Sequence, residues 1–160
     1  MKKYFFLLLI LITSCTTIHK IPDEFKARVI KVRDGDTVEV LYKKQIVVIR
    51  LEHIDCPERG QPFSKNAKQL TTDFCYDKRV KILSKGKYDR YKRLIGEVVL
   101  KNKNLNQELV KKGFALHYKK YSKDKTYKTL EDQARKSKAG MWSQEKLIEP
   151  WLFRKNRKNN

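Results

Sequence analysis

Residues 27–51 read ARVIKVRDGDTVEVLYKKQIVVIRL and contain three runs of β-branched residues that partly alternate with charged ones. The runs cover residues 27–32, 37–42 and 46–51, and they are separated by an Asp-Gly turn and a Lys-Lys-Gln turn. This pattern predicts a meander of three antiparallel strands. Arg50 lies within the third run, and an arginine in an otherwise apolar strand needs an anionic partner.

The chain that follows predicts two more strands and three helices. A helical pattern begins at Ser64 and places its apolar residues on one face, so this helix should pack on the sheet. Residues 80–83 and 94–100 are apolar runs typical of strands. Two further helical patterns stop at Gly113 and Gly140, which suit helix C-terminal positions. The sequence therefore predicts an α+β fold, a five-stranded OB-fold β-barrel with about three helices.

The N-terminus predicts export. Residues 1–14 combine a basic head, an apolar run and small residues, as in a signal peptide, and the run is too short for a permanent transmembrane helix. The Ile-Thr-Ser-Cys sequence ending at Cys15 resembles a lipobox, which favours a lipidated Cys15 in the cell envelope. The alternative is an ordinary signal peptide and a secreted protein. Residues 15–24 then form a tether.

Length and charge indicate the partner. A chain of 160 residues has the size of one domain, which we place at residues 25–150, followed by a basic tail at 151–160. The formal net charge is +20, and removing residues 1–14 takes away two lysines and no acid. Such a chain attracts polyanions, which favours DNA and RNA as partners over an anionic membrane surface. We expect a monomer.

Three segments at strand borders carry the residues suited to chemistry: DGDT at 34–37, RLEHIDCPE at 50–58 and DRYKR at 89–93. Asp36 and Asp55 are hard oxygen donors that, with a backbone carbonyl and waters, can bind Ca²⁺, although DGD alone is more often only a hairpin turn. Glu58 follows a proline and could take a proton from water, although a lone glutamate is usually a surface residue. Arg50 and Arg93 offer planar forks for phosphate oxygens.

Taken together, these three segments resemble the motifs of the staphylococcal nuclease family in order and spacing. The resemblance continues through LVKKGFA at 109–115 and GMWS at 140–143, so it covers about residues 25–145. It implies a five-stranded OB barrel with three helices that hydrolyses DNA and RNA with Ca²⁺ and leaves 3′-phosphate ends.

The resemblance also implies a role for each residue of the site. Asp36 and Asp55 would be the metal carboxylates, the backbone carbonyl of Cys56 a third ligand, and Glu58 the base. Arg50 and Arg93 would bind phosphate and stabilise the transition state. Asp34 would lie near the ion without necessarily touching it, and Tyr118 and Tyr121 would stack a base or simply pack.

Several residues depart from the family pattern or leave alternatives open. Lys92 stands where the family usually has glycine, which puts the placement of Arg93 in question. Cys56 replaces a small or hydroxyl residue, and it could form a disulfide with Cys75 or remain a free thiol. His53 and His117 have no paired metal-ligand spacing, so we interpret both as structural.

The main alternative is a non-catalytic OB-fold lipoprotein that binds nucleic acid, because such barrels hold single strands without chemistry. A membrane-attached structural lipoprotein or adhesin would also explain the signal and the charge. Neither requires a complete set of acids and arginines, which this chain has: Asp36, Arg50, Asp55, Glu58 and Arg93. The sequence therefore favours an active enzyme.

Overall fold

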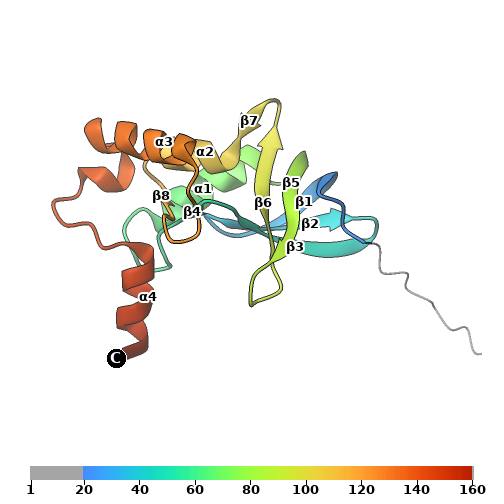
Figure 1. The fold of residues 1–160 in the computed structure, drawn as a ribbon, viewed down its shortest axis with the longest axis horizontal. Helices are drawn as coiled ribbons and strands as arrows, with labels where there is room; N and C mark the ends of the chain where they lie inside the picture. Colours follow the sequence, from blue (N-terminus) through green and yellow to red (C-terminus); the bar gives the residue numbers. More distant parts are fainter. Residues whose placement is uncertain (1–19, 160) are drawn as a thin grey trace, which may run out of the picture.

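The computed structural model describes residues 20–159 and contains a closed barrel with helices gathered at one end (Figure 1). The predicted signal peptide and Cys15 lie outside the described residues. In the part of the chain that is described, no helix has the length and apolar character required to span a membrane.

Five strands form the barrel: β1 Glu24–Asp34, β2 Thr37–Tyr42, β3 Gln45–Leu51, β5 Arg79–Tyr88 and β6 Leu94–Leu100. Their order is β3-β2-β1-β5-β6, and β3 also pairs with β6 in parallel, which closes the sheet. The short strand β7, Lys103–Asn104, pairs antiparallel with the end of β6 at the edge of the sheet. Buried and exposed residues alternate along β1, so its apolar side chains point into the barrel core. The predicted five-stranded OB barrel is confirmed.

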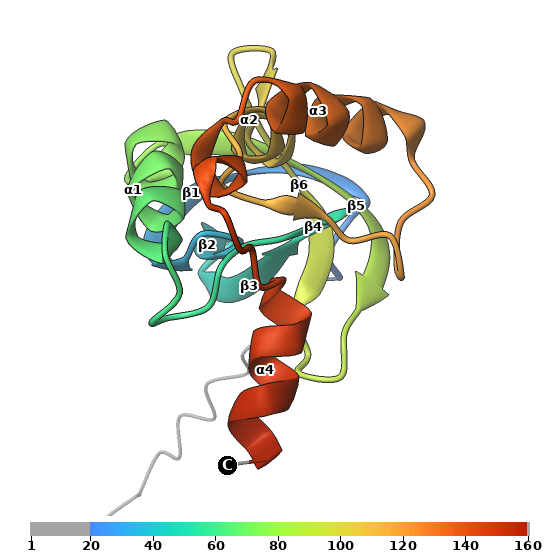
Figure 2. The ribbon, with the colours of Figure 1, turned by 90° about the vertical axis from the view of Figure 1, so that its left-hand side faces the viewer.

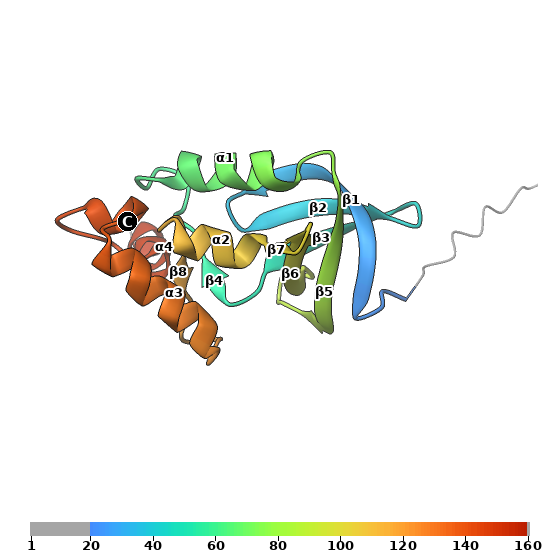
Figure 3. The ribbon, with the colours of Figure 1, turned by 90° about the horizontal axis from the view of Figure 1, so that it is seen from above.

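Three helices form where the sequence pattern places them: α1 Ser64–Cys75, α2 Leu105–Lys111 and α3 Lys125–Lys136. Helix α1 packs on β1, while α2 lies between α1 and α3 (Figure 3). A 3₁₀ helix, Gly140–Ser143, follows α3. Gly113 and Gly140 both have positive φ and approach each other's backbone so closely that a Cβ on either would clash.

The C-terminal residues, which the sequence analysis describes as a basic tail, are helical. They form a fourth helix, α4 Pro150–Asn159. Figure 2 shows that this helix projects away from the barrel and from the other helices. Of residues 150–158 in this helix, only Pro150 is buried. Because so little of α4 is buried, its position depends on a few side-chain contacts with the site described below.

A small two-stranded sheet outside the barrel positions the segment that carries Asp55, Cys56 and Glu58. Strand β4, Ile54–Asp55, pairs with β8, Leu116–His117, so that the chain leaving β3 is attached to the chain leaving α2. Asn106, which is fully buried, fixes the turn between β3 and β4. Its Nδ2 donates to the carbonyl oxygens of Glu52 at 3.0 Å and Gly96 at 3.3 Å.

The disulfide left open by the sequence does not form. Cys56 and Cys75 are both buried free cysteines. The Sγ of Cys75 lies 3.0 Å from the carbonyl oxygen of Thr71, one turn back along α1. Both thiols therefore behave as small packing groups.

Candidate active site

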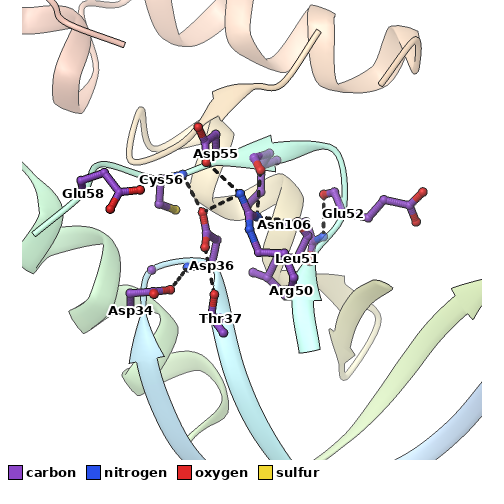
Figure 4. A network of polar contacts seen from close by, with 12 residues as sticks. Asp34, Asp36, Thr37, Arg50, Leu51, Glu52, Asp55, Cys56, Glu58 and Asn106 are labelled. Atoms are coloured by element: carbon purple, nitrogen blue, oxygen red, sulfur yellow. Dashed lines mark hydrogen bonds and ion pairs between the residues drawn. The ribbon is translucent and has the colours of Figure 1, made fainter. Parts of the chain in front are cut away.

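The turn between β1 and β2 holds two aspartates, Asp34 and Asp36, beside the segment that follows β4 (Figure 4). Asp34 Oδ1 accepts from the backbone N–H of Asp36 at 3.2 Å, and Asp36 Oδ2 accepts from the N–H of Cys56 at 2.8 Å. Gly35 allows this approach, because a Cβ there would lie 2.7 Å from Cβ of Ala67. The turn and the segment after β4 are therefore joined at Asp36.

Arg50 finds the anionic partners that its place in β3 requires. Its Nη2 lies 2.8 Å from Asp55 Oδ1 and 3.2 Å from Asp36 Oδ2, while Nη1 donates to the carbonyl oxygens of Leu51 at 2.8 Å and Ile54 at 2.9 Å. Burial disfavours its charged form, but the two aspartates outweigh burial and raise the pKa of the guanidinium. One arginine thus brings Asp36 and Asp55 together.

The aspartates also repel one another. Burial, assisted by the charge of Asp36, raises the pKa of Asp55 to about 6 against the opposing effect of the neighbouring arginines. Loss of solvation and the charge of Asp36 likewise raise the pKa of Asp34 to about 6, although solvent still reaches that side chain. A hard cation would relieve this crowding of negative charge, and carboxylate oxygens are suitable ligands for it.

Glu58 faces the same space as the aspartates. A cavity of about 250 Å³ is lined by Arg33, Asp34, Asp36, Cys56, Pro57, Glu58 and Arg59. The backbone N–H of Glu58 donates to Gln61 Oε1 at 2.8 Å, which fixes the loop after Pro57. Figure 4 shows the carboxylate of Glu58 beside Cys56 and directed toward Asp36. A partly exposed carboxylate beside two aspartates is suited to hold and deprotonate a water.

The side chains alone do not form a metal cage. Within residues 20–159, no three or more His, Cys, Asp or Glu side chains are grouped so that they could hold a metal ion. Burial raises the pKa of the Cys56 thiol well above its ordinary value, so this residue does not offer a thiolate. Any ion at this site therefore needs backbone or water oxygens in addition to the aspartates.

Arg93 reaches the cluster from the loop between β5 and β6. Asp89 holds it, with Oδ2 accepting from Arg93 Nε at 2.7 Å, and Arg93 Nη1 donates to Thr37 Oγ1 at 3.3 Å. Thr37 in turn donates to Asp36 Oδ1 at 3.2 Å. Lys92 adopts a φ of 59°, the left-handed conformation that glycine favours, so the lysine does not displace Arg93 from the site.

One arginine of the site was missed by the sequence analysis. Arg154 on α4 donates from Nη1 to Asp55 Oδ1 at 3.1 Å and to Glu58 Oε1 at 2.6 Å, and from Nη2 to Asp55 Oδ2 at 2.7 Å. Although partial burial opposes its charge, these acids raise the pKa of Arg154. The sequence feature that could have indicated this arginine is the pair of aromatic residues just before it, Trp151 and Phe153, because they anchor the segment to the rest of the fold.

The tyrosines and histidines make contacts of their own beside the site. Tyr118 stacks on Trp151 of α4 with ring centroids 5.3 Å apart and planes 3° apart, and its edge meets Tyr121, which is exposed. His53 Nδ1 and His117 Nε2 lie 2.8 Å and 2.9 Å from the hydroxyl of Ser122. Both imidazoles thus share one hydroxyl, which is consistent with the structural role expected for them.

Comparison with known proteins gives the class of this protein. Residues 48–144 match the family described as "Staphylococcal nuclease homologue". The chain is 39% identical over 134 residues to an "Uncharacterized endonuclease" of Haemophilus influenzae, covering 83% of this chain and 75% of that protein. It is 34% identical over 147 residues to the "Micrococcal nuclease" of Shigella flexneri, covering 85% and 84%. It is also 34% identical over 158 residues to an "Uncharacterized endonuclease" of Escherichia coli O157:H7, covering 96% and 98%.

These matches cover well over half of this chain and of each relative. The chain therefore belongs to the staphylococcal nuclease family, which confirms the resemblance found in its three motifs.

Proposed function

We propose that this protein is a calcium-dependent nuclease that hydrolyses phosphodiester bonds of DNA and RNA and leaves 3′-phosphate ends. Family membership and the nuclease names of its relatives support a nuclease function. The observation that carries the finer proposal is the convergence of Asp36 and Asp55 on Arg50, with Glu58 lining the adjoining cavity.

Asp36 and Asp55 are the carboxylates that would hold Ca²⁺, with the backbone carbonyl of Cys56 and waters completing the ligands. The choice of a hard cation fits the oxygen donors and the crowded negative charge, and a thiolate ligand is disfavoured by the raised pKa of Cys56. When bound, the ion would neutralise charge on the phosphoryl oxygens.

The protein's own side chains would carry out the proton transfer and stabilise the phosphate charge. Glu58 orients a water and accepts its proton as the water oxygen bonds to phosphorus. The bond from phosphorus to the 5′ oxygen breaks and the departing oxygen takes a proton from solvent water, which leaves a 3′-phosphate and a 5′-hydroxyl. Arg50 and Arg93 donate to the phosphate oxygens as charge develops on them, from positions that Asp55 and Asp89 already fix.

The competing function, a non-catalytic OB-fold module that binds nucleic acid, explains the positive charge and the barrel but not this arrangement. A binding module needs cations and aromatic surfaces and gains nothing from buried, mutually repelling aspartates. The enzyme is therefore the better-supported proposal.

Cleavage should depend on calcium. We expect the purified protein to degrade single-stranded DNA and RNA in Ca²⁺ and to stop when the ion is chelated with EGTA, because Asp36 and Asp55 would then be left without their cation. Gel analysis of digests before chelation, after chelation and after calcium is restored measures this. Cleavage that continues undiminished in excess chelator would contradict the metal assignment.

We also propose that the protein is exported and anchored by a lipid on Cys15, on the basis of the lipobox-like sequence. The variant Cys15→Ala lacks the thiol that acylation requires, so it should leave the membrane fraction or accumulate as an uncleaved precursor. Fractionation followed by immunoblotting tests this, with Cys75→Ala as the matched control because that thiol is buried in the domain. A processed Cys15→Ala protein retained on membranes would count against the anchor.

A further inference from the structure

Helix α4 lies beyond residues 48–144, the segment that matches the family description, and it contacts the site. Trp151 stacks on Tyr118, and the ring of Phe153 faces Gly60 in the loop that follows Glu58. The segment before the helix is also attached, because Gln61 Nε2 donates to the carbonyl oxygen of Ile148 at 2.9 Å. These contacts all come from the loops that surround the acidic cluster.

The guanidinium of Arg154 occupies the position of a cation in that cluster. It bonds both oxygens of Asp55 and one oxygen of Glu58, at distances between 2.6 and 3.1 Å. Oδ1 of Asp55 also accepts from Arg50, so arginines already use both oxygens of this carboxylate. A divalent cation at Asp55 would meet a positive charge at contact distance, and Arg154 occupies one of the two oxygens with which Glu58 would hold a water.

The contacts of α4 are suited to reversible release. Beyond Pro150, no residue between 151 and 158 is buried, and Trp151 and Phe153 are only partly covered, so undocking this segment transfers none of its side chains from a fully buried position to solvent. The side chain of Arg154 itself is 34% exposed, against 1% for Asp55. The helix has ten residues, and a helix of this length is marginal in water once its tertiary contacts are lost.

We propose that α4 is an autoinhibitory plug, in which Arg154 occupies the cation position between Asp55 and Glu58 and must be displaced before Ca²⁺ binds. This inference rests on the proposed function, since it assumes that Asp55 is a metal ligand and Glu58 the base. The closed form has Arg154 on the acids and Trp151 on Tyr118. The open form has both contacts broken and the carboxylates free.

Calcium affinity tests the plug directly and without any turnover. Isothermal titration calorimetry of the purified protein with CaCl₂ alone should give a dissociation constant about ten-fold lower for Arg154→Ala than for wild type, if the closed form outnumbers the open form by about ten to one. Arg157→Ala is the matched control, because Arg157 is exposed and lies one turn away on the same helix. This substitution removes the same charge as Arg154→Ala. That variant should bind calcium as wild type does.

A second measurement uses only the wild-type protein and is independent of how any variant folds. Hydrogen exchange of residues 150–159 should accelerate when calcium is added to saturation, because the released helix is too short to stay ordered. Equal calcium affinity in Arg154→Ala and wild type, or unchanged exchange in α4, would overturn the plug while leaving calcium-dependent cleavage intact. Absence of calcium binding in both proteins would overturn the plug together with the proposed function.

Discussion

Glu58→Gln lowers the rate of single-stranded DNA cleavage by about 100-fold or more, as expected for loss of a general base. The amide keeps the size of the side chain and can still accept a hydrogen bond from Arg154, but it cannot take the proton of the attacking water. Binding of nucleic acid should survive, because that binding depends on the many lysines and arginines of the chain. Single-turnover cleavage and a filter-binding assay separate the two effects.

The matched control for this change is Glu145→Gln, which removes the same charge from an exposed glutamate in the segment before α4. It should cleave at the wild-type rate. Circular dichroism of both variants must match wild type before rates are compared. If Glu58→Gln retains wild-type turnover, the base has been assigned to the wrong residue.

Arg50→Lys should reduce cleavage at least as strongly, by about 100-fold or more, because lysine keeps the charge but loses the planar fork. A lysine ammonium cannot reach Asp36, Asp55 and the two backbone carbonyls that Arg50 now bonds. The lost hydrogen bonds in a buried site should also lower the free energy of unfolding by about 1–3 kcal/mol. Denaturant unfolding measures this loss alongside the rate.

Arg33→Lys is the control for that change, since Arg33 lines the same cavity but pairs with Glu39 and not with the aspartates of the site. It should leave both the rate and the stability close to wild type. The salt dependence of nucleic-acid binding should be the same in all three proteins, because no charge is lost. Wild-type cleavage by Arg50→Lys would remove Arg50 from the mechanism.

The barrel was predictable because its strands have strong local patterns. Alternation in β1 to β3 and the β-branched composition of β5 and β6 correspond to buried faces, and the helix boundaries follow apolar spacing and terminal glycines. The two-residue strands β4 and β8 were not predictable, because two residues carry no periodicity. Their pairing is a tertiary contact that the turn held by Asn106 makes possible.

The site was predictable where its residues fall in contiguous motifs. Asp36, Asp55 and Glu58 line one region because the DGD turn and the β4 segment meet at Asp36. Arg154 was not predictable by the same means, because it lies 99 residues from Asp55 and belongs to none of the three motifs. The position of its helix depends on the contacts of Trp151 and Arg154 with loops that are distant in sequence. The local sequence does not indicate those contacts.

Cleavage of one single-stranded oligonucleotide by wild type and Glu58→Gln, side by side in calcium, in chelator and after calcium is restored, tests the proposed active site most directly. A calcium-dependent nuclease that uses Glu58 predicts rapid cleavage only by wild type, only while calcium is present, and recovered when the ion returns. Cleavage that persists in chelator, or that is equally fast in Glu58→Gln, would contradict it.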